Sequence, residues 1–246
     1  YISKYGDEVI IFDKKAIAKE TDKGDNQDGM DTVLYSRNAC FQIAENIGYK
    51  YFVELDDDYG GFRWEFDNHF NFHVEKINKS LNSIFNIFTE FLINTNVHSI
   101  AFAQEGDFMG GENASINFDC GKVGLHRKCM NSFICSTGRP FKFMGRMNED
   151  VNAYVHHGNV GFVFFTNNQL ALKQLQTQAS AGGLTEMYLE YGTYVKSFYT
   201  VMYQPSSVKV APMGITQYRL HHLVNWNTTV PKILSESMRM TCRIRL

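Results

Sequence analysis

The chain reads Tyr51-Phe52-Val53-Glu54-Leu55-Asp56-Asp57-Asp58 where an apolar run meets three consecutive carboxylates. Aromatic and β-branched residues dominate the run, which is typical of a buried strand. The carboxylates would then lie where the strand leaves its sheet, and open α/β sheets bind ligands at that end of their strands. Side chains alternate along a strand, so Asp56 and Asp58 would converge on one side. Adjacent negative charges repel one another, and the stretch therefore indicates either a divalent-cation site or a solvated acidic turn.

The composition indicates a globular chain with one sizeable core. Of its 246 residues, 44% are hydrophobic and 14% aromatic, which is enough for a single domain. The net charge of −2 and the pI of about 6.5 give no overall basic character of the kind that favours nucleic-acid binding. The cysteines have no CxxC spacing, which indicates free thiols in a reducing compartment and not a zinc site or a disulfide framework. We find no membrane-spanning apolar run and no signal peptide, so we expect a cytoplasmic protein.

Strand and helix patterns alternate along the rest of the chain, which predicts one α/β domain. We expect strands at 8–13, 51–55, 62–66, 99–103, 129–135, 161–165, 208–211 and 218–223, and helices at 32–46, 74–93, 151–157 and 185–203. The order strand, helix, strand at the start predicts a parallel unit with a crossover. Glycine-rich loops at 104–111 and 180–183 would let the backbone approach a ligand closely. Neither loop contains GxxxxGK[ST], and no GxGxxG follows a strand, which argues against a P-loop enzyme and a dehydrogenase.

Arg37 and Asn38 stand near the start of the helix that precedes the acidic stretch. An arginine beside a helix N-terminus is a good contact for an anion or a nucleotide. The alternative is a surface arginine on an amphipathic helix.

Asn148-Glu149-Asp150 comes directly before another predicted helix. Carboxylates there either cap the helix and complement its dipole or provide a general base for an acceptor hydroxyl.

His221 and His222 follow Arg219 on a late strand. An imidazole nitrogen from one of them could complete a metal shell, and the alternative is a structural role.

Taken in order, these motifs resemble those of GT-A glycosyltransferases, over roughly 9–231. Further segments resemble the TET-associated glycosyltransferases of bacteriophages, which are relatives of the base J glucosyltransferase. These segments are Tyr35-Ser36-Arg37-Asn38-Ala39, Phe102-Ala103-Gln104, Ser180-Ala181-Gly182-Gly183-Leu184-Thr185-Glu186, and Arg219-Leu220-His221-His222 with Trp226 and Pro231-Lys232. That family is inferred to add sugars to 5-hydroxymethylated pyrimidines in DNA.

The resemblance implies a Rossmann-like GT-A fold, with a mostly parallel central sheet flanked by helices in one domain over 1–246. Residues 1–122 would bind the nucleotide sugar and the metal, and 123–246 would bind the acceptor and carry catalysis. The implied roles are Mn²⁺ or Mg²⁺ ligation by Asp56, Asp58, His221 and His222; donor binding by Arg37, Asn38, Asp56, Asp57, Gln104, Gly110 and Gly111; catalysis by Asp150 and Glu149; and acceptor binding by Gly182, Gly183, Glu186, Arg219 and Trp226.

The implied reaction moves a sugar from a nucleotide-sugar donor to the hydroxyl of a hydroxymethylated base, with the metal stabilising the leaving diphosphate. It would take place in the host cytoplasm if a phage encodes the protein, with DNA as partner and no membrane. Three alternatives stay open: a GT-A enzyme with a polysaccharide or protein acceptor, a non-catalytic nucleotide- or nucleic-acid-binding module, and a metal-dependent nuclease.

Overall fold

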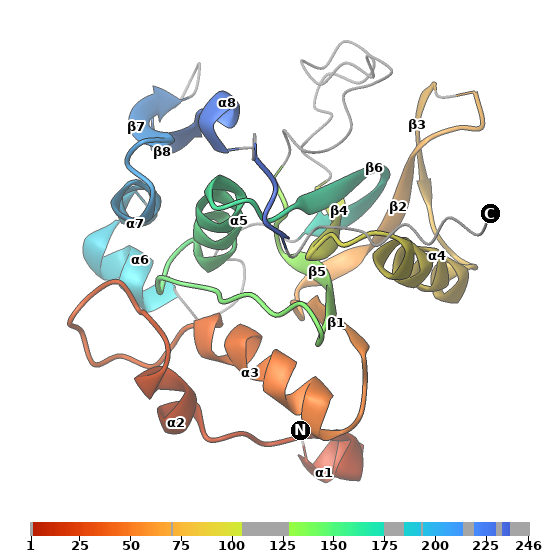
Figure 1. Ribbon diagram of the computed structural model, residues 1–246, viewed down its shortest axis with the longest axis horizontal. Coiled ribbons are helices and arrows are strands. Elements are labelled where there is room, and N and C mark those ends of the chain that lie inside the picture. Colours follow the sequence, from red (N-terminus) through yellow and green to blue (C-terminus); the bar gives the residue numbers. More distant parts are fainter. Residues whose placement is uncertain are drawn as a thin grey trace.

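The computed structural model describes residues 2–69, 71–104, 128–174, 185–192, 194–213, 219–229 and 233–236. Helices lie on both faces of a six-stranded sheet, and a two-stranded sheet stands apart from it (Figure 1). In chain order the elements are α1 (Ile2–Tyr5), η1 (Gly6–Glu8), α2 (Lys14–Lys19), α3 (Leu34–Asn46), β1 (Tyr51–Leu55), β2 (Tyr59–Phe66), β3 (Phe72–Lys76), α4 (Leu81–Asn94), β4 (Ser99–Gln104), β5 (Ser132–Ser136), α5 (Glu149–Asn159), β6 (Phe164–Gln174), α6 (Thr185–Tyr191), α7 (Val195–Tyr203), β7 (Val208–Met213), β8 (Arg219–Val224) and α8 (Trp226–Thr229). The α/β class with flanking helices is confirmed.

The direction of the strands differs from the expected mostly parallel sheet. The large sheet has the order β1-β5-β4-β6-β2-β3, and among the described strands only β4 and β6 pair in parallel. The predicted strand at 8–13 is wrong, because the Asp13 side chain accepts hydrogen bonds from the backbone N–H groups of Lys15 and Ala16 and caps α2. The expected parallel unit therefore has no first strand. The predicted boundary at residue 122 lies outside the described residues.

Two of the predicted helices have different bounds. Residues 72–76 form β3, which pairs with β2 in an antiparallel hairpin, so α4 begins only at Leu81. The helix expected over 185–203 is broken at Gly192, whose φ of +82° is the left-handed conformation that favours glycine. The break separates α6 from α7 and lets α7 pack against β7 and β8.

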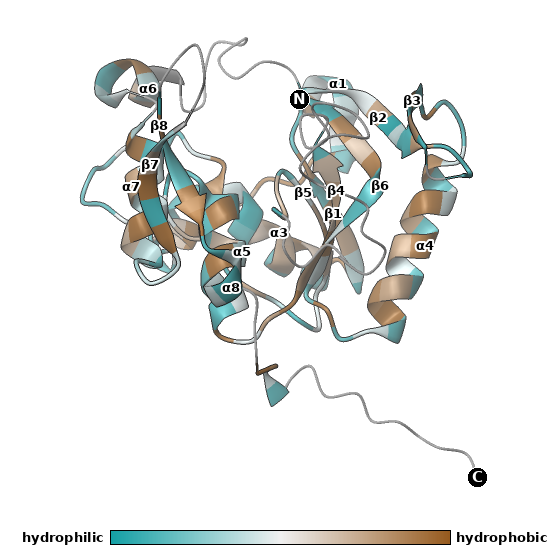
Figure 2. Cartoon of the chain, turned by 90° about the horizontal axis from the view of Figure 1, so that it is seen from above, coloured by the Kyte–Doolittle hydropathy of each residue, from teal (hydrophilic) through white to brown (hydrophobic). Residues whose placement is uncertain are grey.

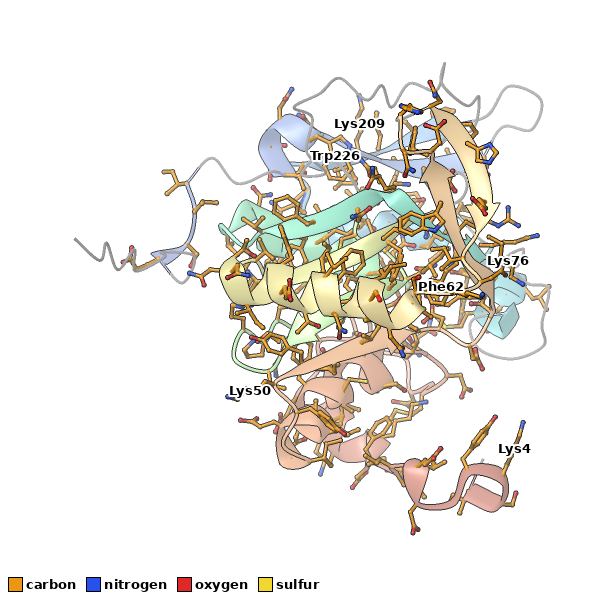
Figure 3. The ribbon with its side chains drawn as sticks, turned by 90° about the vertical axis from the view of Figure 1, so that its right-hand side faces the viewer. Lys4, Lys50, Phe62, Lys76, Lys209 and Trp226 are labelled. Atoms are coloured by element: carbon orange, nitrogen blue, oxygen red, sulfur yellow. The ribbon has the colours of Figure 1, made fainter. Side chains whose placement is uncertain are left out.

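Each face of the large sheet has its own apolar core, because neighbouring side chains on a strand point in opposite directions. Figure 2 shows α4 on one side of the sheet and α3 and α5 on the other. Ile100 and Phe102 of β4 pack with α4, whereas Ala101 between them packs with α3 and α5. On β2, Phe62 meets Phe85 of α4 edge to face, with ring centroids 6.3 Å apart (Figure 3). The two cores fix β1, α3 and α5 relative to one another.

The loop before α3 is tied to the segment before α5 through Arg146, which is only 1% exposed. Its Nε donates to Asp25 at 2.9 Å, and its Nη1 donates to the Gly29 carbonyl at 2.8 Å. The Gly145 N–H adds a bond of 2.9 Å to the Asp22 carbonyl. These bonds hold the chain on either side of the site described below.

We expect the protein to lose stability in acid, and the buried side chain of His98 allows a test of this expectation. Its ring is buried and stacked on Phe162, with centroids 3.9 Å apart. Burial, aided by the charges of Arg139 and His157, lowers the pKa of His98 from 6.5 to about 4. The unfolded chain then binds a proton at His98 more readily than the folded chain does. The free energy of unfolding therefore decreases as the pH falls from 6.5 towards 4. His98→Phe keeps the stack and removes the titration, so its free energy of unfolding should fall less steeply over this range than that of the wild type.

Urea denaturation at a series of pH values between about 7.5 and 4 measures this difference. His157, whose pKa is also lowered to about 4 by its burial, continues to titrate in the variant, so part of the decline should persist. Parallel curves for the two proteins would contradict the assignment to His98.

Candidate active site

The guanidinium of Arg37, on α3, lies at the centre of a group of carboxylates. Its Nη2 donates to Asp56 Oδ1 at 2.8 Å, and its Nε donates to Glu149 Oε1 at 3.0 Å. Its Nη1 lies 3.7 Å from Glu54 Oε2. Arg37 is only 4% exposed, so these ion pairs are shielded from water. The alternative of a surface arginine on an amphipathic helix is therefore wrong, because Arg37 joins α3, β1 and α5 in the interior.

The local structure explains why these side chains meet. Glu54 and Asp56 are two positions apart at the end of β1, so alternation along the strand directs both towards α3. Glu149 is the first residue of α5, and Asn148 before it has a φ of +55°. That left-handed turn starts the helix with its first carboxylates buried against Arg37.

Negative charge in this group exceeds the single positive charge of Arg37. Burial raises the pKa of Glu54 to about 8, of Glu149 to about 7 and of Asp56 to about 6, in each case against the opposing charge of Arg37. Burial by itself would lower the pKa of Arg37, but the carboxylates more than reverse that effect and raise it. The group would therefore be stabilised by protons or by a bound cation.

Asp56 and Asp58 fit a cation site. Asp57 is exposed and the aspartates on either side of it are half-buried, as strand alternation predicts. Asp58 Oδ1 is buried without a hydrogen-bond partner in the described part of the chain. The charge of Asp58 also contributes to the raised pKa of Asp56, so the two carboxylates are close. A buried oxygen without a donor, next to a second carboxylate, is what a hard divalent cation coordinates.

His221 and His222 lie among cationic side chains. The described residues contain no group of three or more His, Cys, Asp or Glu side chains arranged to hold a metal. After burial, the causes that lower the pKa of His221 to about 4 are the positive charges of Lys128, Arg219 and Lys196. Metal ligation by these histidines stays a prediction.

Glu149 and Asp150 have different environments although both are buried. Glu149 is held by Arg37, whereas Asp150 Oδ1 accepts the N–H of Val151 at 2.7 Å and so caps the first turn of α5. The charge of Asp150 also helps to raise the pKa of Asp56, so the two carboxylates lie within electrostatic range of each other. The site therefore contains one carboxylate fixed by an ion pair and a second beside the predicted cation ligands.

Comparison with known proteins identifies the family. A family model described as TET-Associated Glycosyltransferase matches residues 1–183. The chain belongs to this family. It is therefore a nucleotide-sugar-dependent transferase, and modified DNA bases are the general class of acceptor. Searches of curated proteins and of solved structures found no match.

The matched region contains Arg37, the three aspartates and Glu149-Asp150, and it ends before α6. The residues predicted to bind the donor thus lie within the part of the chain that the family model matches. No helix in the described residues is long and apolar enough to cross a membrane. The described cysteines, Cys40, Cys129 and Cys135, are free thiols, as the sequence predicts.

The remaining residues predicted to bind the donor or the acceptor have different surroundings in the structure. The Asn38 amide bonds both backbone groups of Phe143, donating at 3.0 Å and accepting at 2.8 Å, so it has a structural partner. Gln104 ends β4 and is half-buried. Trp226 stacks on Tyr154 with centroids 6.0 Å apart, Arg219 is exposed on β8, and Glu186 lies in α6. Gly110, Gly111, Gly182 and Gly183 lie outside the described residues.

The sequence did not single out three residues of the site. Glu54 could have been found, since it precedes Asp56 by two positions on the same strand. Tyr188 has a pKa raised to about 12 by burial and by the charges of Glu149 and Asp150. The Lys196 ammonium lies 5.7 Å from the centre of the Tyr188 ring. Tyr188 and Lys196 are brought together by the break at Gly192, and a glycine inside a helical pattern is the signal that could have revealed it.

Removing Arg37 should destabilise the transferase strongly. Arg37→Met leaves Glu54, Asp56 and Glu149 buried without their counter-charge, and breaking a buried ion pair in this way costs about 3–5 kcal/mol. Arg37→Lys keeps the charge but not the planar fork that reaches three carboxylates, so its loss should be smaller. Urea denaturation measures both values. An Arg37→Met protein as stable as the wild type would show that the ion pairs contribute little.

Proposed function

We propose that the chain transfers a sugar from a nucleotide-sugar donor to the hydroxyl of a 5-hydroxymethylated pyrimidine in DNA, in a reaction that depends on Mn²⁺ or Mg²⁺. The observation that carries this proposal is the group of carboxylates around Arg37 at the carboxyl end of β1. It supplies cation ligands on one side and a candidate base, Asp150, on the other. We place the reaction in the cytoplasm, where hydroxymethylated phage or host DNA would be available.

On the donor side, Asp56 and Asp58 would hold the cation. When bound, the cation supplies positive charge for the leaving diphosphate. Arg37 fixes the position of Asp56 through the bond of 2.8 Å, and the remaining carboxylates add negative charge around it. The buried, unpartnered Oδ1 of Asp58 supports this assignment.

On the acceptor side, Asp150 is the carboxylate that we assign to the hydroxyl. Glu149 is engaged by Arg37, which leaves Asp150 as the carboxylate beside Asp56 that Arg37 does not bond. If the transfer inverts the anomeric centre, Asp150 takes the acceptor proton as a general base. If configuration is retained, no such base is required and Asp150 orients the hydroxyl.

The test of this function uses matched DNA duplexes that contain 5-hydroxymethylcytosine, 5-hydroxymethyluracil or only the four ordinary bases. The protein is incubated with each duplex, a panel of nucleotide sugars and Mn²⁺, and the DNA is digested for mass spectrometry. We expect a nucleoside heavier by one sugar from a hydroxymethylated duplex and none from the ordinary one. Donor turnover without any sugar on DNA would instead favour a polysaccharide or protein acceptor.

Replacing Asp58 by Asn should abolish Mn²⁺-dependent donor binding, because an amide oxygen is a weaker ligand than a carboxylate. Glu45→Gln is the matched control, since Glu45 is an exposed carboxylate near the end of α3 with no predicted role in the site. Calorimetric titration with the donor, with and without Mn²⁺, compares the two variants. The prediction is wrong if Asp58→Asn binds the donor in Mn²⁺ as tightly as Glu45→Gln does.

Replacing Asp150 by Asn should leave donor binding intact. In an inverting transfer the rate should fall by about 10²- to 10⁴-fold, because the amide cannot take a proton. In a retaining transfer the main loss should be in affinity for the acceptor. Steady-state kinetics with varied DNA concentration separate the two cases. Wild-type turnover together with wild-type acceptor affinity would remove Asp150 from the site.

A further inference from the structure

Positively charged side chains gather on the Asp150 side of the site, and the chemistry above does not use them. Lys196 comes from α7, Arg219 and His221 come from β8, and Lys128 precedes β5. Because α7 packs against β8, Lys196 comes near the strand that carries Arg219 and His221. The positive charges of Lys128, Arg219 and Lys196 all lower the pKa of His221, and those of Arg219 and Lys128 lower the pKa of Lys196. The negative charge of Asp150 raises the pKa of Lys196 instead. Segments far apart in sequence therefore bring cations together beside one carboxylate.

Asn148 ties this cation group to the active site. Its side-chain amide donates to the Lys196 carbonyl at 3.0 Å and to Thr200 Oγ1 at 3.2 Å, which anchors α7. The same nitrogen lies 3.2 Å from His222 Nδ1, which anchors β8. Because Asn148 directly precedes Glu149 and Asp150, the cations are fixed relative to the catalytic carboxylate.

A buried histidine in the group has an unused polar atom. His222 is 5% exposed, and its Nε2 has no hydrogen-bond partner in the part of the chain that the structure describes. Its ring centroid lies 4.1 Å from that of His221, and Lys128 and Lys196 are among its neighbours. A buried polar atom without a partner costs stability unless a ligand or water bonds to it. Because cationic side chains surround this histidine, the ligand that suits the site is one that accepts hydrogen bonds and carries negative charge.

We propose that Lys196, Arg219 and His221, together with Lys128, form a phosphate-binding site beside Asp150. The inference rests on the proposed function for its ligand, since both substrates, the nucleotide sugar and DNA, carry phosphates. Arginine and lysine are the side chains that bind phosphate oxygens best. A net charge of −2 gives the whole chain no attraction to DNA, so a polyanionic acceptor requires a local group of this kind. The site also gives the histidine pair a role other than the predicted metal ligation.

The experiment compares Lys196→Gln and Arg219→Gln with Lys50→Gln as a matched control. Lys50 is exposed just before β1, and Figure 3 shows it far from Lys209 and Trp226, which lie with β7 and β8. One arm measures binding of an unmodified DNA duplex by fluorescence anisotropy across a salt series. The other arm measures binding of inorganic pyrophosphate by calorimetry. Thermal melting checks that each variant is folded, and Lys196→Arg is the charge-retaining variant.

We expect Lys196→Gln and Arg219→Gln each to weaken DNA binding about tenfold and to reduce the salt dependence by about one phosphate contact. Lys196→Arg and Lys50→Gln should bind like the wild type. A loss confined to DNA identifies a backbone phosphate, and a loss confined to pyrophosphate identifies the donor diphosphate. Wild-type binding of both ligands by folded Lys196→Gln and Arg219→Gln would overturn the proposal.

These outcomes are separate from those of the transfer assay, because neither arm requires a sugar or a modified base. DNA binding that depends on Lys196 and Arg219, without sugar transfer, would support the phosphate site and count against the proposed acceptor. Sugar transfer with no effect of either variant on binding would support the function and overturn the phosphate site.

Discussion

The buried guanidinium of Arg37 is the interaction on which the arrangement of the site depends. It contacts carboxylates from the end of β1 and from the start of α5, which are distant in sequence. Buried carboxylates that share one region repel each other and lose their hydration. A planar fork with several N–H groups can offset both costs at once, which a lysine in the same position could not do. The ends of these two elements can meet because α3 places Arg37 between them.

Arg37 does not neutralise the site, and the sign of the remaining charge differs between its two sides. Carboxylates dominate near β1, where Asp56 and Asp58 lie, and cations dominate near β8, where Arg219 and His221 lie. The charge of Asp150 affects both regions, since it raises the pKa of Asp56 and that of Lys196. This polarity suits a transfer reaction, because a cation bound to the donor and phosphates of a substrate would each meet charge of the opposite sign.

The sequence predicted the parts of the structure that follow from local patterns. Alternation at the end of β1 correctly separated Asp57 from its two neighbours, and the apolar period located α3 and β4. The strand directions were not predictable in the same way, because a strand has the same local pattern whichever way its partner runs. The strand expected at 8–13 failed because Glu8 belongs to η1, the Asp13 side chain caps α2, and the residues between them pair with no described strand.

The role of Arg37 and the surroundings of the histidines were hidden for a common reason. An ion pair between residues 37 and 149 depends on how α3 and α5 pack, and no short motif reports it. Likewise, two adjacent histidines suggest a metal until the neighbouring charges are known, and here those charges come from separate segments. The family match ends at residue 183, before Lys196, Arg219 and His221. Through the hydrogen bonds of Asn148, the folded chain joins α7 and β8 to the start of α5, a relation that no local pattern in the sequence reports.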